Sequence, residues 1–151
     1  MKKFSSFVSN NFEVKLANHA DELNEIYKLR YEELLLCYNQ NNSNETGLFI
    51  DEYDEQSDHL IVVDLRNGMI AGTYRLVRKE HIENIGSFMT ESEFDLTNLK
   101  DYDVLELARA VVRKEYRDGI TIALLWQGIL RYVEAYQIKF LFGTASFHGT
   151  D

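Results

Sequence analysis

The sequence of 151 residues is poor in cysteine, in positive charge and in long apolar runs, and it contains no proline. The single cysteine, Cys37, excludes an internal disulfide and a cysteine-based zinc site. The four histidines are not spaced as metal ligands, so no metal site is predicted. No apolar run reaches the ~18 residues of a membrane-spanning helix. The net charge of −9 argues against nucleic acid as a partner.

The remaining composition is that of an ordinary globular domain, with 45% hydrophobic and 27% charged residues. The length allows one domain with its own core, and we expect a single domain over residues 1–151. Met1–Val8 begins like a signal peptide, but Ser9–Asn11 interrupts the apolar stretch, so the cytoplasm is the predicted compartment. The few basic residues gather in two groups that could bind an anionic ligand or an acidic partner, namely Arg75, Arg78 and Lys79, and Arg109, Arg113, Lys114 and Arg117.

Hydrophobic periodicity predicts a mixed α/β domain. The expected strands are Phe12–Leu16, His59–Leu65, Met69–Val77, Val104–Val112 and Ile138–Ala145. The expected helices run from an N-cap at Asn18 to about Tyr38, from Thr90 to Leu96, and from Ile120 to about Tyr136. Asn67-Gly68 predicts a hairpin turn with positive φ at both residues, and residues 39–57 are expected to form a loop. The last strand–helix–strand unit predicts a parallel crossover.

Charged residues interrupt segments that otherwise read as buried, and a buried charge is costly unless it is paired or used. Arg30 falls on the apolar stripe of the first helix, where spacing alone favours snorkelling to the surface over pointing into a site. Arg75 shares a strand face with small and apolar residues. Glu106 and Arg109 lie on opposite faces under ideal alternation, and a bulge would bring them to one face.

The junction before the last helix has the features of an anion site. Tyr116–Ile120 joins a strand to a helix N-terminus through a glycine, and Arg113 and Arg117 add positive charge. The serines lack a nucleophile elbow, and Cys37 has no evident histidine partner. Direct transfer between two bound substrates, assisted by a general base, is therefore the favoured chemistry. The candidate carboxylates are Glu106, Asp51 and Asp54.

Six segments, in order and spacing, resemble the GNAT-fold acyltransferases that take acyl groups from acyl carrier protein. They are Leu29–Tyr31, Asp51–Leu60, Gly72–Leu76, Phe88–Leu96, Leu105–Arg109 and Tyr116–Gly119. The best match is to the ornithine N-acyltransferases of ornithine-lipid synthesis, whose relatives often carry the label hemolysin. The acyl-homoserine lactone synthases are similar at a greater distance. The resemblance implies a GNAT-like α+β mixed sheet.

The resemblance also implies an N-acylation without a permanently bound cofactor. The donor would be a long-chain, 3-hydroxylated acyl group on the phosphopantetheine of acyl carrier protein, with acyl-CoA as the other source. The acceptor would be the α-amine of ornithine or a similar amino acid. The product would be a lyso-ornithine lipid, which would bring the protein to the inner membrane surface.

By matching motif position, the resemblance assigns the polar site to Arg30, Asp51, Asp54, Arg75, Glu106 and Arg109. Glu106 would help to deprotonate the amine, directly or through water, and Arg109 would support the network. Asp51 and Asp54 would either hold the cationic acceptor or fix the loop by pairing with arginines. The donor phosphate would bind at Arg113, Arg117, Asp118, Gly119 and Ile120.

Two departures from the family pattern leave alternatives open. Arg117-Asp118-Gly119 is shorter than the phosphate loop of acetyl-CoA-dependent members, which favours a carrier-protein arm. Family members continue past Asp151, so we expect a chain truncated before the strands that complete the sheet. The alternatives are an acyl-homoserine lactone or other N-acyl amino acid synthase, and an inactive fragment of such an enzyme.

Overall fold

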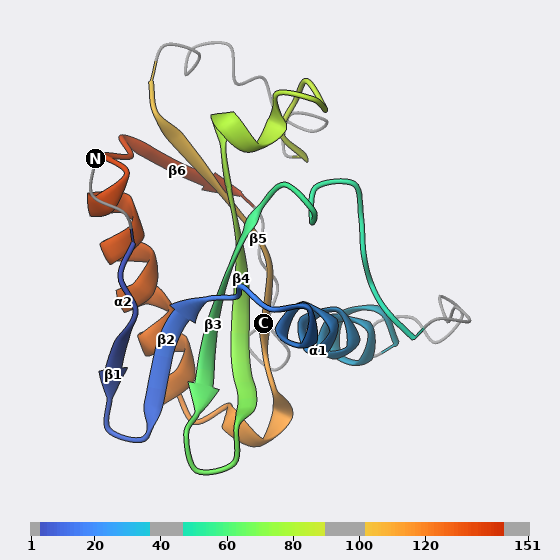
Figure 1. The fold of residues 1–151 in the computed structure, drawn as a ribbon, viewed down its shortest axis with the longest axis vertical. Helices are drawn as coiled ribbons and strands as arrows, with labels where there is room; N and C mark the ends of the chain where they lie inside the picture. Colours follow the sequence, from blue (N-terminus) through green and yellow to red (C-terminus); the bar gives the residue numbers. More distant parts are fainter. Residues whose placement is uncertain (1–3, 37–46, 90–101, 144–151) are drawn as a thin grey trace.

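The computed structural model describes residues 4–36, 47–89 and 102–143, and these form one sheet flanked by helices (Figure 1). The strands follow one another across the sheet in chain order, and every neighbouring pair is antiparallel except the last, which is parallel. They are β1 Phe7–Ser9, β2 Phe12–Leu16, β3 Asp58–Asp64, β4 Met69–Arg78, β5 Val104–Val112 and β6 Phe140–Gly143. The predicted parallel crossover is thus confirmed, whereas β1 was not predicted.

Two α-helices cover opposite faces of this sheet (Figure 1). Helix α1 spans Ala20–Arg30 and continues as a π-helical segment over Tyr31–Leu36, and helix α2 spans Ile120–Ala135. Short 3-10 turns occupy Lys79–Ile82 and Lys114–Tyr116. No helix within the described ranges is long and apolar enough to cross a membrane.

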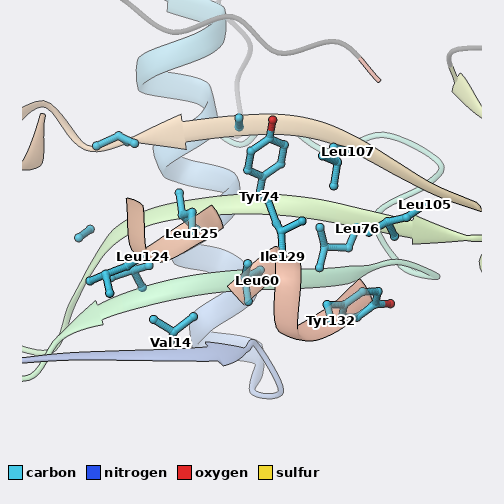
Figure 2. Close-up of a cluster of buried hydrophobic side chains, with 14 residues drawn as sticks. Val14, Leu60, Tyr74, Leu76, Leu105, Leu107, Leu124, Leu125, Ile129 and Tyr132 are labelled. Carbon is cyan, nitrogen blue, oxygen red and sulfur yellow. The ribbon is translucent and has the colours of Figure 1, made fainter. Parts of the chain in front are cut away.

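Alternation along the strands separates the apolar side chains into two layers. On β3, Leu60 and Val62 pack under α2, whereas Ile61 between them packs under α1. Figure 2 shows the α2 layer, in which Leu76 and Leu105 from neighbouring strands meet the helix. The alternating apolar pattern of the sequence therefore places one layer of core on each side of the sheet.

Two local predictions were wrong. The N-cap of α1 is His19, and the preceding Asn18 contributes only its backbone N–H, which donates to Glu22 Oε1 at 3.0 Å. In the hairpin between β3 and β4, only Gly68 has positive φ, at 75°. Asp64 pairs with Met69, so residues 65–68 form a longer turn in which Asn67 keeps ordinary backbone angles. The predicted Thr90–Leu96 helix and Cys37 lie outside the described residues.

Helix α2 approaches the sheet closely at Gly128. A Cβ at this position would lie 2.8 Å from Leu60 Cδ2 and 2.9 Å from Val14 Cγ1, and both neighbours are fully buried. We expect Gly128→Ala to lower the free energy of unfolding by about 1 kcal/mol, because overpacking costs ~1–3 kcal/mol and the gain in helix propensity returns only ~1 kcal/mol. Urea denaturation measures this change.

The neighbouring exposed position provides the control for that prediction. Gln127→Ala alters the same turn of α2 without entering the core, so its effect should stay within about 0.5 kcal/mol. A Gly128→Ala protein at least as stable as the parent would show that Leu60 and Val14 move aside without cost.

Strand β6 pairs with β5 over a short stretch only. The pairing runs from Val104 opposite Phe140 to Leu107 opposite Gly143. Phe140 and Leu141 are 43% and 40% exposed, respectively, although both are large and apolar. Among the described residues, the β6-facing edge of β5 beyond Leu107 therefore carries no strand partner.

Candidate active site

A chain of ion pairs lies on the α1 side of the sheet. Arg30 ends helix α1, Arg75 lies on β4 and Arg109 on β5, and the loop before β3 brings Asp51 and Asp54 between them. Asp54 Oδ1 accepts hydrogen bonds from Arg30 Nη1 at 2.6 Å and from Arg75 Nη1 at 3.2 Å. Asp51 accepts from Arg75 Nη1 at 2.6 Å through Oδ1 and from Arg109 Nη2 at 2.9 Å through Oδ2. The order Arg30–Asp54–Arg75–Asp51–Arg109 defines what we call the arginine–aspartate chain.

The two carboxylates also shape their own loop. Asp54 Oδ2 accepts the backbone N–H of Asp51 at 2.8 Å, and Asp51 Oδ1 accepts the N–H of Tyr53 at 2.9 Å. The Tyr53 hydroxyl donates to the carbonyl oxygen of Ser87 at 3.0 Å. Such side-chain to backbone bonds are typical of aspartates that hold turns. The acidic run is therefore an ordered part of the site.

An aromatic ring lies beside each arginine of the chain. The guanidinium carbon is 5.5 Å from the Tyr27 ring for Arg30, 5.4 Å from the Tyr53 ring for Arg75 and 4.5 Å from the Phe49 ring for Arg109. A cation over an aromatic face is stabilised by the ring quadrupole. These rings restrict the orientation of each guanidinium while leaving its N–H groups available to carboxylates.

Burial makes this pairing necessary. Arg30 and Arg75 are 0% exposed and Asp54 is 2% exposed. Burial opposes the charge of Arg75, but hydrogen bonds and attraction from Asp51 and Asp54 outweigh it and raise the pKa of Arg75. Burial likewise opposes the charge of Asp51, yet its bonds to Arg75, Arg109 and the Tyr53 N–H lower the pKa of Asp51 to about 2. Asp51 and Arg75 are thus both ionised at neutral pH.

Two alternatives left open by the sequence can now be separated. Arg30 does not snorkel, since its side chain is 1% exposed and bonded to Asp54. Its tip lies under the loop because α1 ends there and Asp54 supplies the countercharge. Asp51 and Asp54 pair with arginines, as the loop-fixing alternative predicts, so their carboxylates are already engaged.

A bulge in β5 brings Arg109 to the face of Glu106. Thr73 pairs with Val111 and Arg75 with Ala108, so one residue of β4 faces two of β5. Arg109 takes the left-handed φ of 55°, which is rare for a bulky residue. Glu106 is fully buried opposite Val77, on the face away from α2. The conditional prediction of a bulge is therefore confirmed.

The predicted phosphate residues contact other groups. Arg117 donates to the Val112 carbonyl oxygen at 2.9 Å and pairs with Glu33 of the π-helical segment. Arg113 donates to the Ile70 carbonyl oxygen at 2.9 Å and pairs with Glu25 of α1 at 3.1 Å.

The carboxylate of Asp118, two residues before α2, accepts a hydrogen bond from the first turn of this helix. Gly119 caps the helix with φ of 94°, and the N–H of Ile120 donates to Asp118 Oδ1 at 3.1 Å. Glu106 lies six residues before the end of β5, roughly 20 Å from it at ~3.3 Å per residue. The junction therefore lies beyond the end of β5, which is three residues past Arg109 and six past Glu106.

The first basic group of the sequence divides between the two faces of the sheet. Arg75 joins the arginine–aspartate chain, whereas Arg78 Nε donates to the Tyr132 hydroxyl of α2 at 2.7 Å. The Tyr132 hydroxyl in turn donates to Asp58 Oδ2 at 2.6 Å. An odd spacing of three residues on a strand explains the division. Arg75 and Arg78 therefore do not act together as one group for an anionic ligand.

The sequence reasoning overlooked His59. This residue is 2% exposed, and its ring contacts Arg30 Nη2 at 3.2 Å and the Asp54 carbonyl oxygen at 2.9 Å. His59 lies two residues before Ile61 on β3, so the two side chains share a sheet face. Because Ile61 packs under α1, this pattern could have placed His59 on the site face. The register that brings it opposite Arg75 includes an irregularity at Val62/Val63, which periodicity does not reveal.

The protonation of His59 should make the protein acid-sensitive. Burial, with the charges of Arg30 and Arg75, lowers the pKa of His59 to about 4, while Asp54 opposes this shift. Unfolded His59 binds a proton below pH ~6.5 and native His59 does not, so stability should fall as the pH drops from ~6.5 towards 4.

Urea denaturation at pH 7.5 and pH 5.0 measures this dependence. We expect the loss between the two pH values to be smaller in His59→Asn than in the parent. The pKa of His81 is also lowered by burial, so part of the loss should remain in the variant. Equal losses in parent and variant would contradict a neutral native His59.

Comparisons with known proteins identify the family to which this fold belongs. The family model described as an acetyltransferase (GNAT) domain matches residues 29–127. An L-ornithine N(alpha)-acyltransferase of Rhodobacter capsulatus is 36% identical over 151 residues, covering 93% of this chain and 58% of that protein. A second one, of Brucella abortus, is 41% identical over 108 residues, covering 66% of this chain and 38% of that protein. The chain thus spans about half the length of these curated relatives.

A solved structure shares the fold. The AHL synthase LasI superposes with a TM-score of 0.63 over 87% of this chain and 71% of that chain, at 16% sequence identity. A likeness at this identity concerns the fold alone. Within the described residues, no group of three His, Cys, Asp or Glu side chains is arranged to hold a metal ion.

Proposed function

This chain belongs to the acetyltransferase (GNAT) family, and we propose that it transfers an acyl group to the α-amine of ornithine or a similar amino acid. The predicted GNAT-like α+β fold is confirmed by the family match and by the likeness to LasI. The curated relatives named as L-ornithine N(alpha)-acyltransferases support the acceptor. The observation that carries the proposal is the buried arginine–aspartate chain, on the same face of the sheet as the buried Glu106, in a protein with such relatives.

The proposed reaction needs an amine without its extra proton. Glu106 takes a proton from the α-ammonium group, directly or through water, and the amine nitrogen then attacks the thioester carbonyl carbon. The C–N bond forms and the C–S bond breaks, and the leaving thiolate takes the second proton of the attacking nitrogen to become the free thiol. General base assistance of this kind contributes about 10²–10⁴-fold in rate. The ion pairs of the arginine–aspartate chain fix Arg109 and the 51–54 loop on the face of the sheet that carries Glu106.

The proposed donor is a 3-hydroxylated long-chain acyl group on the phosphopantetheine arm of acyl carrier protein. The β6-facing edge of β5 beyond Leu107, which has no strand partner among the described residues, offers backbone groups to the amides of such an arm. This edge runs from Glu106 towards Arg113, Arg117, Asp118, Gly119 and Ile120, where the phosphate would bind. For this, Arg117 and Arg113 must exchange Glu33 and Glu25 for the phosphate.

The product of this reaction would be a lyso-ornithine lipid. Its acyl chain favours the membrane surface, which supports a peripheral association during product release. Acyl carrier protein is an acidic partner, and Arg113, Lys114 and Arg117 supply positive charge near the proposed phosphate site.

The test is an acylation assay with mass-spectrometric detection. The protein is incubated with a 3-hydroxyacyl group loaded either on acyl carrier protein or on CoA, and with ornithine, lysine or homoserine lactone as acceptor. We expect N-acyl ornithine to form fastest from acyl carrier protein. Faster acylation of homoserine lactone would support the synthase alternative, and no product from a folded protein would refute an acyltransferase activity of this chain.

A further inference from the structure

His59 uses both of its ring nitrogens inside the site. Nδ1 lies 3.2 Å from Arg30 Nη2, and Nε2 lies 2.9 Å from the carbonyl oxygen of Asp54. A guanidinium has only donors and a carbonyl oxygen only accepts. Nδ1 must therefore be the acceptor, and Nε2 must carry the single proton. The two partners alone determine the tautomer.

The position of His59 joins three parts of the site. It stands near the start of β3, directly opposite Arg75 on β4, and its carbonyl oxygen accepts the N–H of Ala17 at 2.8 Å. Its ring packs edge-on against Tyr27 of α1 at 6.0 Å. The side chain thus connects the end of α1, the loop with Asp54 and the central strands.

We propose that His59 is a positioning residue, whose Nε2-protonated ring aims the Arg30 guanidinium at Asp54 and ties the 51–57 loop to β3. The proposal concerns the geometry of the site, and its kinetic consequence rests on the proposed acyltransferase function. His59 acts through Arg30 and Asp54, which hold Arg75, Asp51 and then Arg109 in place. A displaced catalytic group can cost about 10²-fold in rate even when the cause is remote.

The surroundings of the ring oppose a second proton. Arg30 lies against Nδ1 from α1, and Arg75 stands opposite on β4, so a charged imidazole would face two cations. Asp54 is the near anion, with Oδ1 at 3.9 Å from Nε2. Tyr27 adds only an aromatic edge. The lowered pKa of His59, about 4, agrees with this arrangement.

The same contacts exclude a direct role as the general base. A base needs a free nitrogen within hydrogen-bond reach of the proton that it takes. Both nitrogens of His59 are occupied by protein groups, and the residue is 2% exposed. Its contribution must therefore pass through its partners.

Three substitutions separate the two bonds of the ring. His59→Asn keeps an acceptor near Nδ1 for Arg30, His59→Gln keeps a donor near Nε2 for Asp54, and His59→Phe keeps only the ring shape. If positioning is the role, kcat for ornithine acylation falls about 10- to 100-fold in His59→Phe, with KM within about twofold. Asn and Gln should each recover part of this loss. Thermal unfolding of every variant identifies any assay temperature at which it is not folded.

A spectroscopic measurement tests the inference without any activity. Long-range 1H–15N correlation spectra of histidine-labelled protein, assigned with His59→Asn, should show a neutral Nε2–H ring for His59 from pH 7.5 down to pH 5. An imidazolium or an Nδ1–H ring at pH 7 would overturn the inference whatever the activity. An active His59→Phe protein with unchanged kcat would overturn it as well. An inactive parent with the expected spectrum would count against the acyltransferase function and leave the ring assignment supported.

Discussion

Replacing Arg30 by methionine is expected to lower the free energy of unfolding by about 3–5 kcal/mol, because it removes one partner from a buried ion pair. Arg30 is fully buried and bonded to Asp54 at 2.6 Å. Its removal leaves Asp54 with less countercharge and His59 without its donor. The loss is large against the ~5–15 kcal/mol that hold a typical domain together. Urea denaturation followed by circular dichroism at pH 7.5 measures it.

A cation two residues earlier on the same helix serves as the matched control. Lys28 is exposed on α1, and lysine, arginine and methionine have similar helix propensities. Lys28→Met should therefore change the free energy of unfolding by no more than about 0.5 kcal/mol. Similar effects for the two variants would mean that the buried pair contributes no more than a surface charge.

Replacing Glu106 by glutamine is expected to reduce kcat for ornithine acylation at least about 100-fold, with little change in KM. Glutamine keeps the size of the side chain but cannot take a proton from the ammonium group. The defect should shrink as the pH rises, because the fraction of acceptor with a neutral amine increases without help from the protein. Initial rates of N-acyl ornithine formation between pH 6.5 and pH 9.5 measure both effects.

The pH trend distinguishes the proposed base from a structural carboxylate. A Glu106→Gln defect that stays constant with pH would assign Glu106 a role in holding the site, and an unchanged kcat would remove it from the reaction. Glu134→Gln is the matched control, since Glu134 is exposed near the end of α2. This control should leave kcat and KM within about twofold of the parent.

The positions of the strands and helices could be predicted well because they depend on local periodicity. Each central strand carries its own apolar alternation, and α2 follows directly after a glycine that stops the preceding segment. β1 was missed because three residues beside Asn10-Asn11 contain too little pattern. The end of α1 was misplaced because the change to a π-helical segment at Tyr31 leaves the apolar stripe unbroken.

Part of the polar site could also be predicted from the sequence. Arg30, Arg75 and Glu106 stand out because they occupy otherwise apolar faces, where a charge is costly. The ion-pair partners of these residues could not be predicted. The bond between Arg109 and Asp51 depends on a left-handed residue in a bulge, and nothing in the alternation of β5 requires that bulge.

The ion-pair partners of Arg113 and Arg117 likewise could not be predicted from the sequence. Their sequence position beside a helix start suggests a common anion site, yet they pair with Glu25 and Glu33, far away in the chain. Such long-range pairing follows from how α1 packs across the end of β5. Periodicity contains no information about that packing.

The sequence by itself thus determined strands β2 to β6, the two helices that cover the sheet and the charged side chains that interrupt its apolar faces. The tertiary structure alone decided that Arg30 is buried, that Asp51 and Asp54 pair with arginines, and that the His59 ring contacts Arg30. The physical reason is the separation along the chain over which each effect acts. Backbone alternation acts between neighbouring residues, whereas a buried charge is stabilised by whichever opposite charge the register, the bulge and the loop bring within about 3 Å.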